Sequence, residues 1–285
     1  MAQETSDGRP LVLLIAAPLP PPHGGIARYM QLCLPAMVRK GYRVRIVQPD
    51  QGVEPQPLRG LPPSADVKTS VFSYPGVLRL AWWLLRRPSL ALRLFAWYAR
   101  PVLRRPGFAG RQLAATACWI RSSEELLGDD RPSIAHAYVW PWSHGAAAVL
   151  LADRHGGKSM VSLFGDVLPH IDELNQFDSV SRPFHSTTRA VLQRADLVAS
   201  MTEHCRRLVR HVDLPPGEVA LVRVMGDMLP FHRGVDGKAL RQRHAPEGGP
   251  VLLFVGHVRP RKGPQVLLEA LPKIRTRHPN TRLII

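Results

Sequence analysis

The sequence predicts an α/β protein with one complete doubly wound domain and the beginning of a second domain. Apolar runs of strand length alternate with segments of helical period along most of the 285 residues. Two of these runs, Leu11–Ala17 and Val251–Val255, are continuously apolar, as are strands that a parallel sheet buries on both faces. Each run is followed by a loop that contains glycine and then by a helical segment, which is the order of a βαβ unit.

The first such unit shows how the elements are identified. From Ile26 to Val38, apolar residues recur every three or four positions and so lie on one face of an expected helix, which Pro35 should kink. Gly41 ends that helix, and Tyr42–Val47 has the composition of the next strand. Two strands joined in this way pair in parallel.

The alternation continues along the rest of the sequence. Further strands are expected at Val67–Phe72, Ile134–Tyr138, Ser159–Phe164, Leu197–Met201, Val219–Val224 and Arg282–Ile285. Further helices are expected at Ser143–His155, Ser179–Arg194, Thr202–Val212 and Pro264–Arg277. A helical insertion broken at Pro88 and Pro106 fills Tyr74–Leu127.

These elements predict a domain organisation. Residues 1–225 form an N-terminal Rossmann-like domain with the insertion at about 74–127, residues 226–249 have the small and charged composition of a linker, and residues 250–285 begin a second domain. A segment as short as 250–285 cannot bury a core of its own. We therefore expect the chain to be truncated within its second domain.

The charge of the chain is concentrated in the insertion. The formal net charge is +16, and the stretch from Thr69 to Ser123 holds nine arginines and no acidic residue. Such a patch attracts polyanions. With no recognised nucleic-acid-binding module beside it, nucleic acid is not expected as a partner. Two interpretations remain: an aromatic and basic surface that lies on anionic lipid, or a packed helical flank with solvated arginines. Four arginines would serve the lipid surface: Arg86, Arg87, Arg104 and Arg105.

Cysteine use and hydropathy indicate the compartment. Cys33, Cys118 and Cys205 are odd in number, widely spaced and without a CxxC pair, which argues against a disulfide framework or a zinc site. No apolar stretch approaches the roughly 20 residues that span a bilayer, and the acidic residues before Leu11–Ala17 do not fit a signal peptide. We expect a cytoplasmic protein, peripheral at most on the inner face of the membrane.

Two loops between a strand and a helix have the composition of anion sites. The first ends in Gly24 and Gly25, which let the backbone approach a ligand in front of a helix N-terminus. The second, Gly256–Gly263, adds arginine and lysine, which provide a fork and a point charge for phosphate oxygens. The simpler alternatives are a tight turn and a solvated basic loop. Neither loop is the dinucleotide fingerprint or a P-loop.

The chain resembles the retaining glycosyltransferases of the large family-four group, which have the two-Rossmann GT-B architecture. Residues 21–44 (PPHGGIARYMQLCLPAMVRKGYRV) resemble the first strand-to-helix segment of that family. Residues 195–209 (ADLVASMTEHCRRLV) resemble the strand and helix that close its first domain. Residues 251–274 (VLLFVGHVRPRKGPQVLLEALPKI) resemble the start of its donor domain. The resemblance covers most of the chain and is thin between Pro49 and Pro132.

The resemblance implies transfer of a sugar from a nucleoside-diphosphate sugar to a glycan or lipid-linked acceptor, with retention of configuration and without cofactor or metal. In the family, the first glycine loop lies beside the donor diphosphate, and cations of the second loop neutralise it as it leaves. Fixed cations act most strongly as that bond breaks. The donor-binding residues implied in this sequence are Gly24, Gly25, Gly256, His257, Arg259, Arg261 and Lys262.

The sequence departs from the family pattern at two positions. Phe164 occupies the place of a histidine that contacts the reacting sugar, and His257 occupies the place of an arginine, for which Arg259 or Arg261 must substitute. The paired glutamates of the donor domain would fall beyond Ile285.

Other residues are candidates for the acceptor side of the site. Asp166 either orients an acceptor hydroxyl, as the catalytic candidate, or caps a helix. His136, at the end of a strand, either faces the acceptor or is a buried and satisfied core histidine. His170 is a further candidate that could replace the missing histidine.

The resulting hypothesis is a glycosyltransferase. The departures at Phe164 and His257 keep two alternatives open, a non-catalytic GT-B-like scaffold or sugar-binding protein, and a membrane-surface module on a Rossmann-like platform.

Overall fold

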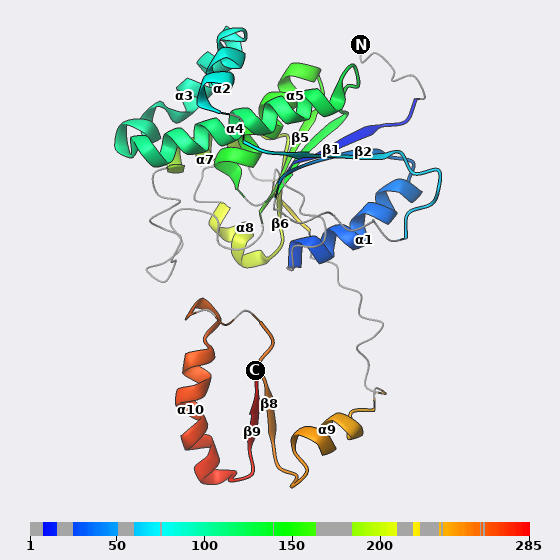
Figure 1. Ribbon diagram of the computed structural model, residues 1–285, viewed down its shortest axis with the longest axis vertical. Helices are drawn as coiled ribbons and strands as arrows, with labels where there is room; N and C mark the ends of the chain where they lie inside the picture. Colours follow the sequence, from blue (N-terminus) through cyan, green and yellow to red (C-terminus); the bar gives the residue numbers. More distant parts are fainter. Residues whose placement is uncertain are drawn as a thin grey trace. The chain divides into compact units, whose positions relative to one another are not determined.

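The computed structural model divides the chain into two compact units, Met1–Gly226 and Asp227–Ile285, drawn from blue to red along the sequence in Figure 1. It describes residues 8–15, 25–50, 60–74, 76–138, 140–163, 184–209, 219–222, 234, 236–256, 258 and 260–285, with the backbone alone at 25–28, 77, 185, 208 and 261.

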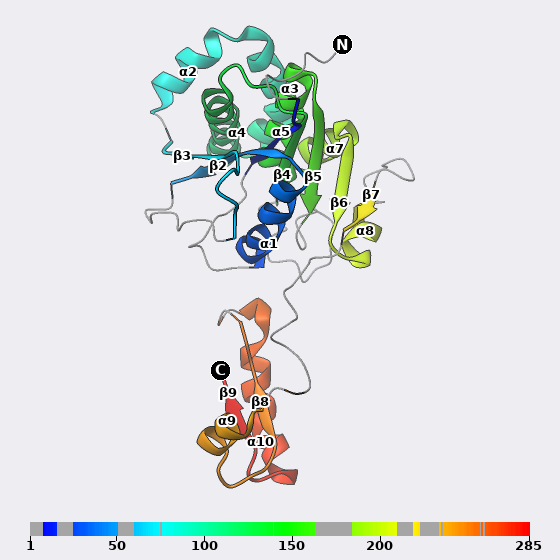
Figure 2. The same ribbon diagram turned by 90° about the vertical axis from the view of Figure 1, so that its right-hand side faces the viewer.

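The first unit is built on a seven-stranded sheet in the order β3-β2-β1-β4-β5-β6-β7, in which every neighbouring pair is parallel. Figure 2 shows β2 and β3 at one edge of this sheet and β6 and β7 at the other. The predicted parallel α/β sheet is confirmed. Its strands are β1 (Leu11–Ile15), β2 (Arg43–Pro49), β3 (Val67–Phe72), β4 (Ile134–Tyr138), β5 (Lys158–Leu163), β6 (Leu197–Ser200) and β7 (Val219–Leu221).

Helices cover both faces of the sheet. On one face, Met30 and Leu34 of α1 (Gly25–Arg39) pack against Val12 and Leu14 of β1. On the other face lie α4 (Pro106–Leu127), α5 (Ala146–His155) and α7 (His185–Arg194), and the alternate residues of β1 point into their core. Figure 1 shows α4 and α5 on the side of the sheet opposite α1. The described part of this unit also contains the helix α8 (Glu203–Val209) and the π-helix η1 (Pro141–Gly145).

The insertion between β3 and β4 forms the three helices α2 (Val77–Leu85), α3 (Pro88–Arg104) and α4 (Pro106–Leu127). The predicted breaks at Pro88 and Pro106 are confirmed, because each proline stands in the first turn of the next helix, where its missing N–H costs nothing. In the described part of the chain, no helix is both long and apolar enough to cross a bilayer.

The second unit contains one parallel βαβ element, formed by β8 (Val251–Leu253), α10 (Pro264–Arg277) and β9 (Arg282–Ile284). The segment 226–249, expected to be a linker, contains a helix, α9 (Lys238–His244). A side-chain oxygen of Asp236 accepts a hydrogen bond from the backbone N–H of Lys238, the first residue of this helix, which has no partner within the helix. No residue of α9 is buried, and so no apolar period marks the helix in the sequence.

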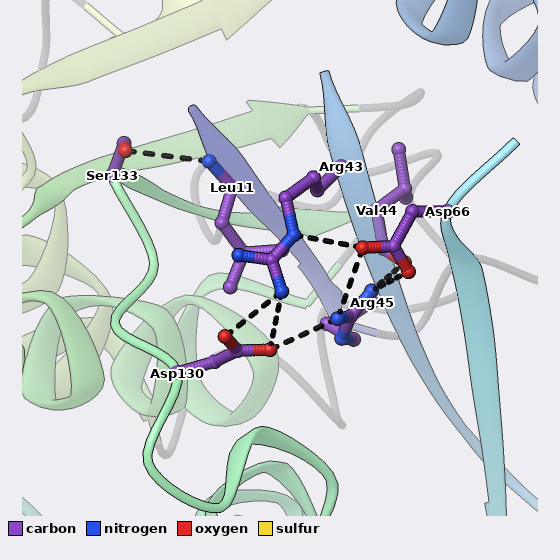
Figure 3. Close-up of polar contacts among 7 residues, drawn as sticks. All are labelled: Leu11, Arg43, Val44, Arg45, Asp66, Asp130 and Ser133. Atoms are coloured by element: carbon purple, nitrogen blue, oxygen red, sulfur yellow. Dashed lines mark hydrogen bonds and ion pairs between the residues drawn. The ribbon is translucent and has the colours of Figure 1, made fainter. Parts of the chain in front are cut away.

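A cluster of ion pairs ties together the amino-terminal ends of the strands. Figure 3 shows the guanidinium groups of Arg43 and Arg45, both on β2, between the carboxylates of Asp66 and Asp130. The side chain of Arg45 is 1% exposed, and its nitrogens lie 2.8 Å from Asp66 and 2.9 Å from Asp130. Asp66 precedes β3 and Asp130 follows α4, so the cluster fixes both elements to β2.

Candidate functional site

The strand order predicts a ligand-binding position beside β1. The chain moves outward from β1 to β2 and β3, and then returns to the other side of β1 as β4. In open parallel sheets, ligands bind outside the carboxyl ends of the strands at such a reversal. Gly25 is the first residue of α1, and the helix of a βαβ unit begins on the carboxyl side of the sheet. The positive end of the α1 dipole therefore lies on the side of the sheet where a ligand is expected.

Beneath this position, His136 of β4 forms the centre of a buried polar network. Its Nε2 atom lies 2.7 Å from Oγ of Ser162 on β5, and its Nδ1 atom lies 3.1 Å from the hydroxyl of Tyr138. The rings of His136 and Tyr138 also contact each other, with centroids 4.2 Å apart. A neutral imidazole has one donor and one acceptor, so one of the two hydroxyls donates to the ring and the other accepts from it.

Burial fixes the protonation states of this network. Burial lowers the pKa of His136 to about 3, so the ring is neutral at physiological pH. Burial, followed by the charges of Tyr29 and Cys33, raises the pKa of Tyr138 well above its usual value, so its hydroxyl keeps its proton. The network is therefore an uncharged and fixed floor on the α1 face of the sheet. His136 is 5% exposed, which favours the satisfied core histidine over direct contact with a ligand.

Two members of this network, Tyr138 and Ser162, were not predicted from the sequence. Tyr138 stands two residues after His136 on the same strand, and residues with that spacing share a face, so the pattern held a usable signal. Ser162 is the register partner of Tyr138 on β5. In the sequence, β4 precedes α5 and β5 follows it. Ser162 therefore reaches His136 only because these two strands pair in the sheet.

The carboxyl end of β4 runs directly into aromatic residues. Trp142, in the π-helix η1, stacks on Phe184 with ring centroids 5.4 Å apart and an interplanar angle of 12°. Trp140, half-buried, contacts Trp142 at 4.8 Å. The Nδ1–H of His144 donates to the carbonyl oxygen of Tyr138 at 2.7 Å, which anchors η1 to the end of β4. The predicted helix Ser143–His155 thus begins two residues earlier, as a π-turn.

The second unit has its own strand–turn–helix segment. After β8, the chain passes Gly256 and a 3₁₀ turn at Pro260–Lys262, and it enters α10 through Gly263, whose φ of +73° is strained for other residues. The side-chain amide of Gln265 donates to the carbonyl oxygen of Pro260 at 2.9 Å and holds the turn. Lys262 is exposed two residues before the first residue of α10, so its ammonium group and the helix N-terminus both favour an anion.

Several predicted site residues lie outside the described residues: Gly24, Phe164, Asp166, His170, His257 and Arg259. Arg261 belongs to the 3₁₀ turn, but its side chain is not among those described. The described candidates fall into two groups, Gly25 with His136 in the first unit, and Gly256 with Lys262 in the second. Within the described ranges, no group of three or more His, Cys, Asp or Glu side chains is placed to hold a metal ion.

Comparisons with known proteins match both units. Residues 24–224 match the family model described as glycosyl transferase 4-like domain, and residues 236–285 match the model described as glycosyl transferases group 1.

Among individual relatives, a protein of Streptomyces scabiei named D-inositol 3-phosphate glycosyltransferase is 34% identical over 189 residues, which cover 62% of this chain and 41% of that protein. A protein of Corynebacterium efficiens with the same name is 34% identical over 101 residues, covering 33% of this chain and 24% of that protein. The chain therefore spans less than half the length of the relatives it matches.

The crystal structure of Anabaena HepE in complex with UDP and glucose resembles this chain with a TM-score of 0.54 at 12% identity, over 96% of this chain and 60% of HepE. At that identity the likeness bears on the fold alone, and it confirms the predicted GT-B-type class. Since the first family model spans most of the sequence, from residue 24 to residue 224, the chain belongs to the glycosyl transferase 4-like domain family.

Proposed function

We propose that the protein is a retaining glycosyltransferase that moves a sugar from a nucleoside-diphosphate sugar to a glycan or lipid-linked acceptor. The observation that carries the proposal is the match of two glycosyltransferase family models, one to each unit. The two relatives described above, both named D-inositol 3-phosphate glycosyltransferase, support the same activity.

The donor diphosphate is proposed to bind at the two strand–turn–helix segments. The helix N-termini behind Gly25 and Gly263 and the exposed Lys262 support this assignment, because both kinds of group favour phosphate. The similar structure of HepE was determined with UDP and glucose, and also with UDP-glucose, which supports a nucleoside-diphosphate sugar as the donor. The proposed donor-binding residues remain Gly24, Gly25, Gly256, His257, Arg259, Arg261 and Lys262.

In the proposed reaction, the bond between the anomeric carbon and the diphosphate oxygen breaks, and its electron pair leaves with the nucleoside diphosphate. The acceptor hydroxyl bonds to the anomeric carbon on the same face and gives its proton to the departing diphosphate oxygen. Negative charge grows on the departing oxygen, so Lys262 and the arginines of its loop stabilise the transition state more than the bound substrate. No cofactor or metal takes part in this scheme.

The acceptor is proposed to meet the first unit near Asp166, His136 and His170. Because His136 is buried and bonded to Ser162 and Tyr138, its part in the proposal is to hold the floor of the site rather than to contact the sugar.

A cytoplasmic location, at the inner face of a membrane, belongs to the same proposal. Of the four arginines assigned to an anionic surface, Arg86, Arg104 and Arg105 are exposed. Arg87 lies differently, with its guanidinium group 4.5 Å from the ring centroid of Trp83 and its Nε atom 3.4 Å from Glu124. Arg87 therefore faces α4, and the proposed surface retains the other three.

The test is donor turnover by the full-length protein. Incubation with a panel of nucleoside-diphosphate sugars should release nucleoside diphosphate, and Lys262→Ala should lower kcat/KM by about a hundredfold or more, as expected for loss of a charge that stabilises a leaving group. Lys273→Ala, which removes an exposed lysine elsewhere on α10, is the matched control and should leave kcat/KM unchanged.

Two other results would contradict the proposed function or a part of it. A protein that binds a sugar but turns over no donor is a sugar-binding scaffold. Retention is tested separately by following the anomeric proton of the product by NMR, and an inverted product contradicts that part alone.

A further inference from the structure

The helix α2 presents an apolar stripe to solvent. Leu78, Trp82 and Leu85 are 86%, 59% and 72% exposed. Their spacing of four and three residues places them on one face of the helix. The opposite face packs on the core of the first unit through the buried Leu80. The helix is therefore apolar on two sides, although a surface helix normally has a polar outer face.

The next helix, α3, repeats this arrangement. Leu92, Phe95 and Leu103 are 70%, 63% and 85% exposed, and at 100° per residue they fall within one third of the helix circumference. Leu94 and Tyr98 are buried on the opposite face. Six large apolar side chains are thus exposed on two consecutive helices, and groups of this kind mark interaction surfaces.

Arginines flank both stripes. Arg86, which directly follows α2, lies over the ring of Trp82, with its guanidinium carbon 4.6 Å from the ring centroid. Arg79 projects on the same side of α2, and Arg100 and Arg104 lie along the corresponding side of α3, about a quarter turn from the leucines. In the described part of the chain, none of these four arginines forms an ion pair.

We propose that these stripes of α2 and α3 enter the boundary between headgroups and acyl chains of an anionic bilayer, while the flanking arginines bind lipid phosphates. The inference deepens the membrane contact of the proposed function and rests on it. Helices with Leu, Phe and Trp on one side and arginine beside them are typical of segments that lie in the membrane interface. In the described part of the chain, neither helix is long and apolar enough to span a bilayer.

Charge complementarity favours this partner over a second copy of the chain. The stretch from Thr69 to Ser123 contains nine arginines and no acidic residue, so two copies meeting through it would bring like charges together. An anionic bilayer offers phosphates for the arginines and acyl chains for the stripes in one surface. The proposal differs from simple electrostatic attraction because it requires the apolar side chains to leave water.

The experiment measures vesicle binding by the full-length protein without donor or acceptor. Vesicles of phosphatidylcholine alone are compared with vesicles that also contain phosphatidylglycerol. The protein should bind the anionic vesicles, and the triple variant Leu78→Ser, Leu85→Ser, Leu103→Ser should bind about a hundredfold more weakly, since apolar burial at three sites is lost. Val71→Ser is the matched control, because Val71 is exposed on β3 of the same unit. It should bind like the wild type.

A second measurement does not depend on the triple variant folding. Phospholipids brominated near the headgroup end of their acyl chains should quench tryptophan fluorescence of the bound wild-type protein, and Trp82→Phe should remove most of that quenching. Trp83→Phe is the control, because Trp83 packs against the core. Bound protein without quenching overturns the proposal.

Two further outcomes would contradict the inference. If the triple variant binds like the wild type and high salt alone releases the protein, the contact is purely electrostatic. If no vesicles bind and sedimentation shows self-association that the triple variant abolishes, the surface joins two copies. Turnover with a water-soluble acceptor is measured separately, so loss of turnover with intact vesicle binding refutes the proposed activity and leaves the membrane surface standing.

Discussion

Two buried histidines, His136 and His144, link the stability of the first unit to pH. Burial lowers the pKa of His136 to about 3, and it lowers the pKa of His144 to about 4 even though a hydrogen bond with the Tyr138 carbonyl opposes it. Both rings are neutral in the folded protein, whereas the unfolded chain protonates them below about pH 6.5. The folded state is therefore disfavoured as pH falls from about 6.5 toward the folded pKa values.

The free energy of unfolding should accordingly fall by about 1.4 kcal/mol per pH unit for each histidine between about pH 6 and pH 4.5. Urea denaturation at a series of pH values measures the slope. A variant with His136→Asn and His144→Asn should show a shallower slope in this window. The same slope in variant and wild type would show that other groups control the pH dependence.

The ion-pair cluster on β2 makes the stability of the first unit depend on pH in a lower range. Burial by itself raises the pKa of Asp66, but the hydrogen bonds and charges of Arg45 and Arg43 outweigh it and lower the pKa to about 2. A lowered carboxyl pKa adds stability above about pH 4, and that stability is lost as pH falls from about 4 to about 2.

Removing one carboxylate of this cluster should strongly lower the free energy of unfolding. Asp130→Asn leaves two buried guanidinium groups with one carboxylate between them, and we expect a loss of about 3 kcal/mol in the free energy of unfolding. Asp153→Asn removes an exposed partner of Arg93 and should cost less than about 1 kcal/mol. Equal effects of the two substitutions, measured by urea denaturation, would show that burial does not strengthen the cluster.

At the scale of elements, the turn between α5 and β5 brings Gly157 against the backbone just before β4. A Cβ atom added to Gly157 would lie 2.2 Å from the carbonyl oxygen of Pro132, a backbone atom that cannot move without disturbing the start of β4. Gly157→Ala should therefore lower the free energy of unfolding by about 3 kcal/mol. Gly110 lies inside α4, and a Cβ atom added there would meet no atom of another element within 4 Å. Gly110→Ala should therefore raise the free energy of unfolding by about 0.5–1 kcal/mol. Thermal unfolding of the two variants should shift in opposite directions.

Most elements were predictable because their signals are local. Buried parallel strands are continuous apolar runs, and prolines mark the starts of α3 and α4. The helix α9 was missed because it buries nothing, and η1 because a π-turn has no simple period. The exposure of apolar side chains on the outer faces of α2 and α3 was not predictable either, since an apolar period shows a helix without showing which side meets the core.

The site was predictable to a smaller degree, for the same reason. Gly25 and Lys262 could be singled out from the sequence because each stands in a short strand–turn–helix pattern, which the structure contains in both units. Ser162 becomes a partner of His136 only through the pairing of β4 with β5, which sequence spacing does not reveal, whereas Tyr138 lies two residues after His136 on the same strand. The roles of all the predicted site residues stay predictions, including those of Asp166, His170, His257 and Arg259.

For the whole molecule, the proposed chemistry uses fixed cations and no metal. Turnover of a nucleoside-diphosphate sugar by the full-length protein should therefore be unchanged after dialysis against a chelator. Coupled detection of the released nucleoside diphosphate measures the rate before and after treatment. A loss of activity that added Mg²⁺ or Mn²⁺ restores would contradict the metal-free scheme, and would leave the family assignment intact.

The central position of β1 has a consequence for synthesis on the ribosome. The backbone N–H of Leu11 bonds to the side chain of Ser133, 122 residues later, and β1 pairs with β4 at the middle of the sheet. At roughly 5–20 residues per second, several seconds of translation separate the two strands. During that interval the nascent chain exposes an unpaired apolar strand edge, and the arginine-rich helices emerge before the centre of the sheet can close.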